Sequence, residues 1–215
     1  MITHLLYLHG FRSSPKSFKA QYLAEAVRAR FPQIIWSCPQ LPPSPKSAGE
    51  LILSITCDWP VATSAVVGSS LGGFYANWIA KKMEIKSVLI NPACNPARDL
   101  KKHIGEQTVW HSVEESFYFK TEYIDELLTM SELQKGRSSQ EELATQSPPS
   151  PKNALKQETP QLLMACTGDE VLDWQEMVAF FSGATHYIVQ GSDHAMSDFD
   201  KHAPIALDFL MKRLT

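Results

Sequence analysis

The stretch from Trp59 to Ala80 carries no charged residue, and it constrains the fold of this chain more than any other segment. An apolar stretch of this length is long enough to span a bilayer. It contains a proline, three glycines and several hydroxyl residues, however, and its pattern changes midway from a β-branched run to helical spacing. A buried strand, a tight turn and a helix explain this pattern better than a membrane span.

Short apolar runs recur along the chain and alternate with segments of helical spacing. The predicted strands are residues 3–10, 33–38, 64–68, 86–90, 161–168 and 184–191. The predicted helices lie within residues 14–31, 47–57, 71–83, 173–181 and 201–214. Because almost continuously apolar strands alternate with helices, we expect an α/β fold with about six mostly parallel strands and helices on both faces. The 215 residues, 44% of them hydrophobic, suit one domain over residues 1–215.

Three polar residues are expected to begin helices. Ser14 precedes a proline, which is favoured at the first helical position. Ser47 and Glu50 have the spacing of a capping box. Asp173 stands directly before the helical pattern of residues 174–181.

The alternation breaks between Pro92 and Pro160. Residues 114–134 have the spacing of one or two amphipathic helices, whereas residues 136–153 are polar and rich in serine and proline, which is typical of a mobile connection. A long insertion in a compact α/β domain is usually a lid, a cap or a binding element. We therefore expect residues 98–153 to form a helical lid or cap within the domain.

The glycine-rich turn of the uncharged stretch fits the frame G-x-S-x-G over Gly68–Gly72, with Ser70 at its centre. Ser69 fails the same test, because Val67 and Leu71 stand where glycines would be needed. A nucleophile at a strand-to-helix elbow has a strained backbone, and its neighbours two residues away must be small. The sequence therefore predicts Ser70 as the nucleophile, with a positive φ angle, and Ser69 as an ordinary strand residue. A merely structural glycine-rich turn is the alternative.

A serine hydroxyl needs a base at neutral pH, and the base needs an acid to orient it. His194 is the best placed histidine, because it follows the last predicted strand in a loop before the final helix. Asp169 directly follows the strand of residues 161–168, at the sheet edge where this architecture places its catalytic groups. Asp173 is better explained as a helix cap, and Asp193 is adjacent to His194, a position that rarely orients the ring correctly.

An oxyanion hole needs two backbone donors. The N–H of Leu71, which follows the candidate nucleophile, is one candidate. The loop after the first strand should supply the other, and the Phe11 amide, after the turn allowed by Gly10, is the natural choice. His9 is expected to brace this loop through hydrogen bonds rather than to act as the base.

The chain resembles the YqiA-type esterases of the α/β-hydrolase superfamily. The resemblance rests on its "LLYLHGF" opening, "PQLPPSP" loop, "VVGSSLGG" elbow, "INPA" after the next strand, "TGDEVLD" and "GSDHA", in this order. It covers nearly the whole chain and is weakest over the insertion. The resemblance implies a minimal α/β-hydrolase fold and a serine carboxylesterase that hydrolyses small acyl esters with Ser70, Asp169 and His194 as a catalytic triad. We expect that this reaction needs no cofactor and no metal.

Other functions remain open. A thioesterase or acyltransferase would use the same triad, and a non-catalytic ligand-binding protein could use the same scaffold. The net charge of −3 and the scattered basic residues give no reason to expect a nucleic-acid partner. The N-terminal segment has no charged region followed by a cleavage site, so we expect a cytoplasmic protein with no membrane partner. The sequence does not fix the oligomeric state.

Overall fold

The computed structural model of the chain describes residues 2–110, 112–144 and 159–212, and its centre is a six-stranded, all-parallel sheet. The strand order is β2-β1-β3-β4-β7-β8. The six strands are β1 (His4–Leu8), β2 (Ile35–Ser37), β3 (Ser64–Ser69), β4 (Lys86–Ile90), β7 (Gln161–Cys166) and β8 (Thr185–Val189). The predicted α/β class and the number of strands are confirmed.

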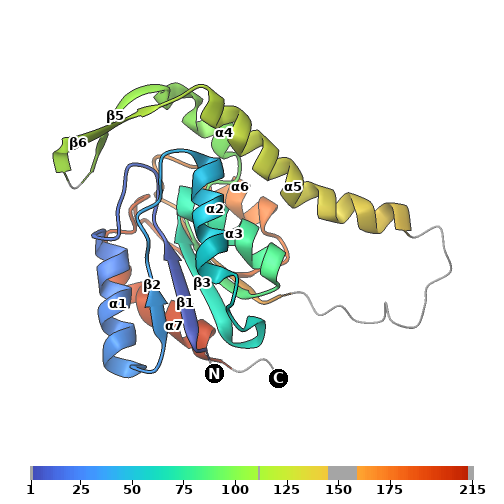
Figure 1. The fold of residues 1–215 in the computed structure, drawn as a ribbon. Coiled ribbons are helices and arrows are strands. Elements are labelled where there is room, and N and C mark those ends of the chain that lie inside the picture. Colours follow the sequence, from blue (N-terminus) through green and yellow to red (C-terminus); the bar gives the residue numbers. More distant parts are fainter. Residues whose placement is uncertain (1, 111, 145–158, 213–215) are drawn as a thin grey trace.

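Helices cover both faces of this sheet, as Figure 1 shows. Helices α1 and α7 pack on one face, and α2, α3 and α6 pack on the other. The helices of these two layers are α1 (Phe18–Arg30), α2 (Pro45–Thr56), α3 (Leu71–Met83), α6 (Trp174–Phe180) and α7 (Phe199–Met211), with a short 3₁₀ helix, η1 (Val61–Thr63), before β3.

Strand periodicity divides the apolar core into two clusters. In β1, for example, Leu6 and Leu8 pack on the side of α2 and α3, whereas Leu5 and Tyr7 pack on the side of α1 and α7. All six residues of β3 are buried, because the strand lies in the middle of the sheet and is covered on both faces. This rigid centre carries the predicted elbow at its carboxyl end.

The segment between β4 and β7 holds a β-hairpin as well as helices. Its elements are α4 (Pro96–Leu100), η2 (Lys101–His103), β5 (Gly105–Val109), β6 (Ser112–Phe119) and α5 (Glu122–Ala144). The prediction of helix from residue 114 is wrong up to Phe119, because β6 pairs antiparallel with β5 and the aromatic residues near its end suit a strand. Residues 136–144 of the predicted mobile connection are helical and continue α5; residues 145–153 lie outside the described residues.

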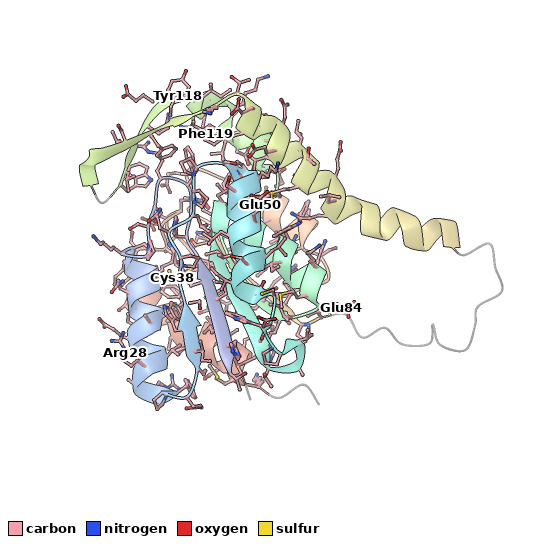
Figure 2. The ribbon with its side chains drawn as sticks, viewed as in Figure 1. Arg28, Cys38, Glu50, Glu84, Tyr118 and Phe119 are labelled. Carbon is pink, nitrogen blue, oxygen red and sulfur yellow. The ribbon has the colours of Figure 1, made fainter. Side chains whose placement is uncertain are left out.

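The hairpin and α5 lie above the carboxyl edge of the sheet, and the far end of α5 extends beyond the body of the molecule (Figure 1). Along β6, Tyr118 is 62% exposed, whereas its neighbour Phe119 is 1% exposed and joins the core on the side of α2 and α3. Both are labelled in Figure 2. This alternation anchors the hairpin on the domain by one of its faces. The boundaries of a lid at residues 98–153 stay a prediction.

Two of the three predicted helix starts are wrong. Helix α1 begins at Phe18, because Ser14 and Ser17 form a separate turn in which the Ser17 N–H donates to the Ser14 carbonyl. Helix α2 begins at Pro45, and the side chain of Ser44 accepts a hydrogen bond from the Ser47 N–H, so Ser44 is the N-cap rather than Ser47.

Asp173 caps α6 as predicted, since its Oδ1 accepts a hydrogen bond from the Gln175 N–H at 2.8 Å. Among the helices that the structure describes, none is long and apolar enough to cross a membrane.

Candidate active site

Ser70 stands at the turn between β3 and α3, with φ 56° and ψ −123°. Ser69, by contrast, is the last residue of β3 and pairs with Ile90. A positive φ is uncommon for a residue with a side chain, and it stores strain of about 1–3 kcal/mol. The predicted backbone geometry of the two serines is therefore confirmed.

The glycines of the elbow permit contacts that a side chain would block. A Cβ atom on Gly68 would lie 2.1 Å from the carbonyl oxygen of Gly72, and a Cβ on Gly72 would lie 2.0 Å from the carbonyl oxygen of Leu8. The beginning of α3 thus packs directly against the backbone of β1 and β3. This explains why the chain needs glycine two residues before and two residues after Ser70.

Three side chains from three loops form a chain of hydrogen bonds at the carboxyl edge of the sheet. His194 Nε2 lies 3.0 Å from Ser70 Oγ, and His194 Nδ1 lies 2.7 Å from Asp169 Oδ2. The Asp169 side chain is fully buried, and the His194 side chain is 17% exposed. The structure therefore brings the three predicted residues together, in the order hydroxyl, imidazole and carboxylate.

The second oxygen of Asp169 is also fixed. Its Oδ1 accepts hydrogen bonds from the N–H groups of Val171 and Leu172, at 2.9 and 2.8 Å. These two hydrogen bonds hold the carboxylate in place while its other oxygen faces His194. Asp193, the neighbour of His194, instead accepts hydrogen bonds from the N–H and the hydroxyl of Ser197, which lower its pKa.

The loop after β1 lies against the elbow. A Cβ on Gly10 would lie 3.2 Å from Ser70 Cβ, so the loop passes close to the candidate nucleophile. The Leu41 N–H donates to His9 Nε2 at 3.0 Å, which leaves the proton on Nδ1, and Nδ1 donates to the Gly10 carbonyl at 2.9 Å. The expectation that His9 braces this loop is confirmed.

Both predicted oxyanion donors border this loop and the elbow. Leu71 is the first residue of α3, so its N–H belongs to the end of the helix that has no internal acceptor. Phe11 follows Gly10, and its ring packs edge-on against Phe117 and Phe119, with centroid distances of 5.8 and 5.1 Å. The hairpin thus holds the side chain of a residue whose amide is a candidate donor.

A cavity of about 380 Å³ opens beside the elbow. Its lining comes from the loop after β1, the proline-rich loop before α2, the start of α3 and the hairpin: His9, Gly10, Phe11, Arg12, Ser13, Gln40, Leu41, Pro42, Pro43, Leu71, Tyr75, Val109 and Phe117. Most of these side chains are apolar. The cavity is thus mainly apolar, and it adjoins Gly10 and Leu71, which flank Ser70.

Arg12 fastens the hairpin to the rim of this cavity. Its guanidinium donates to the carbonyl and the hydroxyl of Thr108, at 2.6 and 2.8 Å, and lies 4.4 Å from the ring centroid of Trp110. The Trp110 N–H donates in turn to the Arg12 carbonyl. Arg12 itself has a positive φ of 58°. The loop that carries Phe11 and the hairpin above it therefore form one connected unit.

Two residues that hold the His194 loop were not predicted from the sequence. Glu170 accepts a hydrogen bond from the His194 N–H at 3.0 Å, and Asn91 donates one to the His194 carbonyl at 2.9 Å. Asn91 is fully buried, with a positive φ of 42°. The signal in the sequence is an asparagine before a proline at the end of a strand, since asparagine tolerates the left-handed region.

A lysine also reaches this loop from α1. Lys19 donates through its ammonium group to the carbonyl of Ala195. Burial lowers the pKa of Lys19 to about 8, although the nearby Asp193, Cys166 and Asp169 oppose this shift. Within the part of the chain that the structure describes, no group of three or more His, Cys, Asp or Glu side chains is arranged to hold a metal ion.

Comparison with known protein families assigns the chain to one of them. The profile of the uncharacterised protein family UPF0227 matches residues 4–211, which is almost the whole sequence. The chain belongs to the UPF0227 family. This is the YqiA family that the sequence blocks resemble, so that prediction is confirmed.

Solved structures share the fold of this UPF0227 member. A putative hydrolase from Agrobacterium vitis S4 is similar with a TM-score of 0.72 at 14% identity, over 97% of this chain and 88% of the other. The α/β-hydrolase domain-containing protein 10 from mouse has a TM-score of 0.68 at 19% identity, over 99% and 90%. A structure of the metagenome-derived lipolytic enzymes LipS and LipT has a TM-score of 0.67 at 15% identity, over 97% and 93%. At these identities the similarity establishes the α/β-hydrolase fold.

Proposed function

We propose that this UPF0227 protein is a serine carboxylesterase that hydrolyses small acyl esters. The observation that carries the proposal is the chain of hydrogen bonds from Ser70 through His194 to Asp169, with Ser70 held at a positive φ angle. A positioned base next to a hydroxyl, oriented in turn by a carboxylate, is the arrangement that activates a serine. The lipolytic enzymes with the same fold are consistent with this reaction.

In the first half of the reaction, Ser70 Oγ attacks the acyl carbonyl carbon while His194 Nε2 takes the hydroxyl proton. Asp169 stabilises the imidazolium that forms and keeps the Nδ1 proton directed towards itself. The carbonyl oxygen becomes an oxyanion that the N–H groups of Phe11 and Leu71 would receive, together with the N-terminus of α3. Collapse of this intermediate expels the alcohol, which takes the proton from His194, and leaves an acyl ester on Ser70.

In the second half, water replaces the alcohol. His194 takes a proton from the attacking water and returns it to Ser70 Oγ as the acyl group leaves as a carboxylic acid. The proposed reaction needs only these side chains and two backbone donors. As the partner of this protein we propose a small acyl ester, and neither a nucleic acid nor a membrane.

The cavity beside the elbow is the proposed site for the apolar part of the ester. Leu71, Val109 and Phe117 contribute to its wall, and two of these three belong to the hairpin. Segments that cover a site commonly move to admit ligand. We therefore propose that the insertion acts as a lid, with the contact between Arg12 and Thr108 as its latch.

The test is a panel of p-nitrophenyl esters of increasing acyl length, with the matched acyl-CoA thioesters beside them. We expect turnover of the oxygen esters by the wild-type protein and none by Ser70→Ala, whose melting temperature should be unchanged. Faster turnover of thioesters than of matched esters would point to a thioesterase. No turnover of any member by a folded wild-type protein would contradict the proposal and favour a ligand-binding protein.

A further inference from the structure

The end of β4 lies between the three loops that carry Ser70, Asp169 and His194. Its backbone flanks the elbow on both sides, because the Ser70 N–H donates to the Ile90 carbonyl at 3.0 Å and the Ala93 N–H donates to the Ser70 carbonyl at 3.1 Å. Asn91 stands between these two contacts. Asn91 therefore lies within the short segment that holds both sides of the Ser70 backbone.

The side chain of Asn91 reaches the other two loops. Its Oδ1 accepts a hydrogen bond from the Cys166 N–H at 2.8 Å, at the end of β7 and three residues before Asp169. Its Nδ2 donates to the carbonyls of His194 at 2.9 Å and Asp193 at 3.3 Å. One amide group thus connects the strand that leads to Asp169 with the backbone of His194 itself.

The surroundings of Asn91 fix the orientation of this amide. The residue has no exposed surface, and its Nδ2 faces two carbonyl oxygens while its Oδ1 faces an N–H donor. Reversing the amide would place like groups against one another, and a buried polar group without a partner is costly. The backbone of Asn91 holds the left-handed φ of 42° that aims the side chain, and its N–H donates to the Met164 carbonyl.

We propose that Asn91 is a positioning residue for the triad. It does not touch the substrate; it sets the distance of His194 and Asp169 from Ser70. This inference rests on the proposed function, because it assumes that the three side chains react together. The Asn91 amide is more than a packing contact, since it joins the end of the strand that leads to Asp169 with the loop that carries His194, and its chain neighbours Ile90 and Ala93 hold the backbone of Ser70.

Two variants of Asn91 separate its side chain from its backbone. Asn91→Gly removes the amide but adopts the left-handed φ freely, whereas Asn91→Ala removes the amide and also strains the backbone. If the amide positions His194, both variants should lose about 100-fold in kcat, the loss typical of a reacting group misplaced by about 1 Å. KM should change by less than about threefold, since the cavity wall is untouched.

Lys86→Met is the matched control. Lys86 is buried at the other end of β4 and donates to three carbonyls near the end of α7. This variant should lower the melting temperature at least as far as Asn91→Gly does, with wild-type kcat. A wild-type kcat in Asn91→Gly would overturn the proposal, as would an equal loss of kcat in Lys86→Met, because the effect would then follow stability.

The positioning role of Asn91 can also be tested separately from ester hydrolysis, by a measurement that needs no turnover. The proton on His194 Nδ1, hydrogen-bonded to Asp169, should give a low-field proton resonance in wild-type protein that disappears or moves upfield in Asn91→Gly. Lys86→Met should keep it. An unchanged resonance in Asn91→Gly would overturn the role of Asn91 even if esters are hydrolysed. Its loss in Asn91→Gly would support that role even if wild-type protein hydrolyses none of the esters tested.

Discussion

At each end of β4, a buried polar side chain donates hydrogen bonds to backbone carbonyls near α7, but the segments that the two side chains hold differ. At the amino end, Lys86 Nζ donates to the carbonyls of Phe209, Leu210 and Lys212, at 3.1, 3.4 and 2.7 Å. At the carboxyl end, Asn91 Nδ2 donates to carbonyls of the loop that precedes α7. Both side chains are buried, and both fasten the C-terminal part of the chain to the middle of the sheet.

What differs is the segment that each end holds. Lys86 satisfies carbonyls at the end of α7, which lack partners within the helix, and this stabilises the fold far from any reacting group. Asn91 holds a loop that carries His194. Parallel sheets place ligands and catalytic groups at the carboxyl ends of their strands. The comparison therefore predicts that changes at the carboxyl end reduce rate and that changes at the amino end reduce stability.

Of the residues that position the reacting groups without attacking the substrate themselves, Asp169 is expected to have the largest effect on rate. Asp169→Asn should lower kcat by about 10⁴-fold, because the imidazole loses the carboxylate that fixes its tautomer. The melting temperature should stay close to that of the wild type, since an amide oxygen can still accept the N–H groups of Val171 and Leu172. Steady-state kinetics and thermal unfolding of the same preparation measure both quantities.

The nearby Asp173→Ala variant is its control. Loss of the cap on α6 should cost about 1 kcal/mol of stability with no loss of kcat. If the two phenotypes were exchanged, the assignment of the triad acid to Asp169 would be wrong.

A smaller loss of rate is expected from crowding the elbow. In Gly10→Ala the new methyl group would lie 3.2 Å from Ser70 Cβ and 3.3 Å from the Ser69 carbonyl oxygen, so the elbow must move by a few tenths of an ångström. We expect kcat to fall by about 10- to 100-fold with little change in the urea midpoint. An unchanged kcat would show that the site tolerates displacement of the elbow. It would then be wrong that changes at the carboxyl end of the sheet reduce rate.

At the amino end the expected effect is on stability. Lys86→Met keeps the apolar stem but removes three hydrogen bonds to carbonyls at the end of α7, and should cost about 1–3 kcal/mol. Urea unfolding followed by circular dichroism measures this loss, and kcat should be that of the wild type. A loss of kcat at temperatures where the variant is fully folded would break the comparison.

The last effect is a dependence of stability on pH, and it concerns Lys19, which bonds the His194 loop from α1. Its pKa is lowered by burial to about 8 in the folded protein, against 10.5 normally. Between these values the unfolded chain binds more protons than the folded one, so this group makes the free energy of unfolding rise with pH from about 8 to about 10.5. Below pH 8 Lys19 is charged in both states, so the cost of burying its charge lowers the free energy of unfolding in full.

Lys19→Met should remove this rise. The free energies of unfolding of wild type and Lys19→Met are measured in urea at pH 7 and at pH 10. The difference between the two proteins at each pH isolates the contribution of Lys19 from those of other titrating groups. A difference that is independent of pH would mean that the folded protein leaves the pKa of Lys19 at its ordinary value.

The sequence predicted those parts of the fold that short-range patterns determine. The bounds of α3 and β4 were predicted as the structure has them, because an apolar strand, glycines and a helical pattern follow one another there. The three side chains that the structure joins by hydrogen bonds, Ser70, His194 and Asp169, were predicted from their places at strand ends. These signals are local, and the parallel sheet brings the strand ends together.

The parts that failed depend on contacts distant in the sequence or on competing local signals. Asn91 could be noticed before Pro92, but its partners Cys166 and His194 lie 75 and 103 residues further on. The β5–β6 hairpin was missed because residues 114–134 show helical spacing throughout, whereas the strand is stabilised by its pairing with β5. Ser44 was overlooked as a cap because the prolines around it indicate a loop.

The central claim is that Ser70 is the nucleophile, and covalent labelling tests it most directly. Wild-type protein, Ser69→Ala and Ser70→Ala are treated with a fluorophosphonate probe, and the modified peptide is identified by mass spectrometry. We expect one phosphonate adduct on Ser70 in the wild type and in Ser69→Ala, and no adduct in folded Ser70→Ala. An adduct on Ser69, an adduct that persists in Ser70→Ala, or no labelling of folded wild-type protein would contradict the claim.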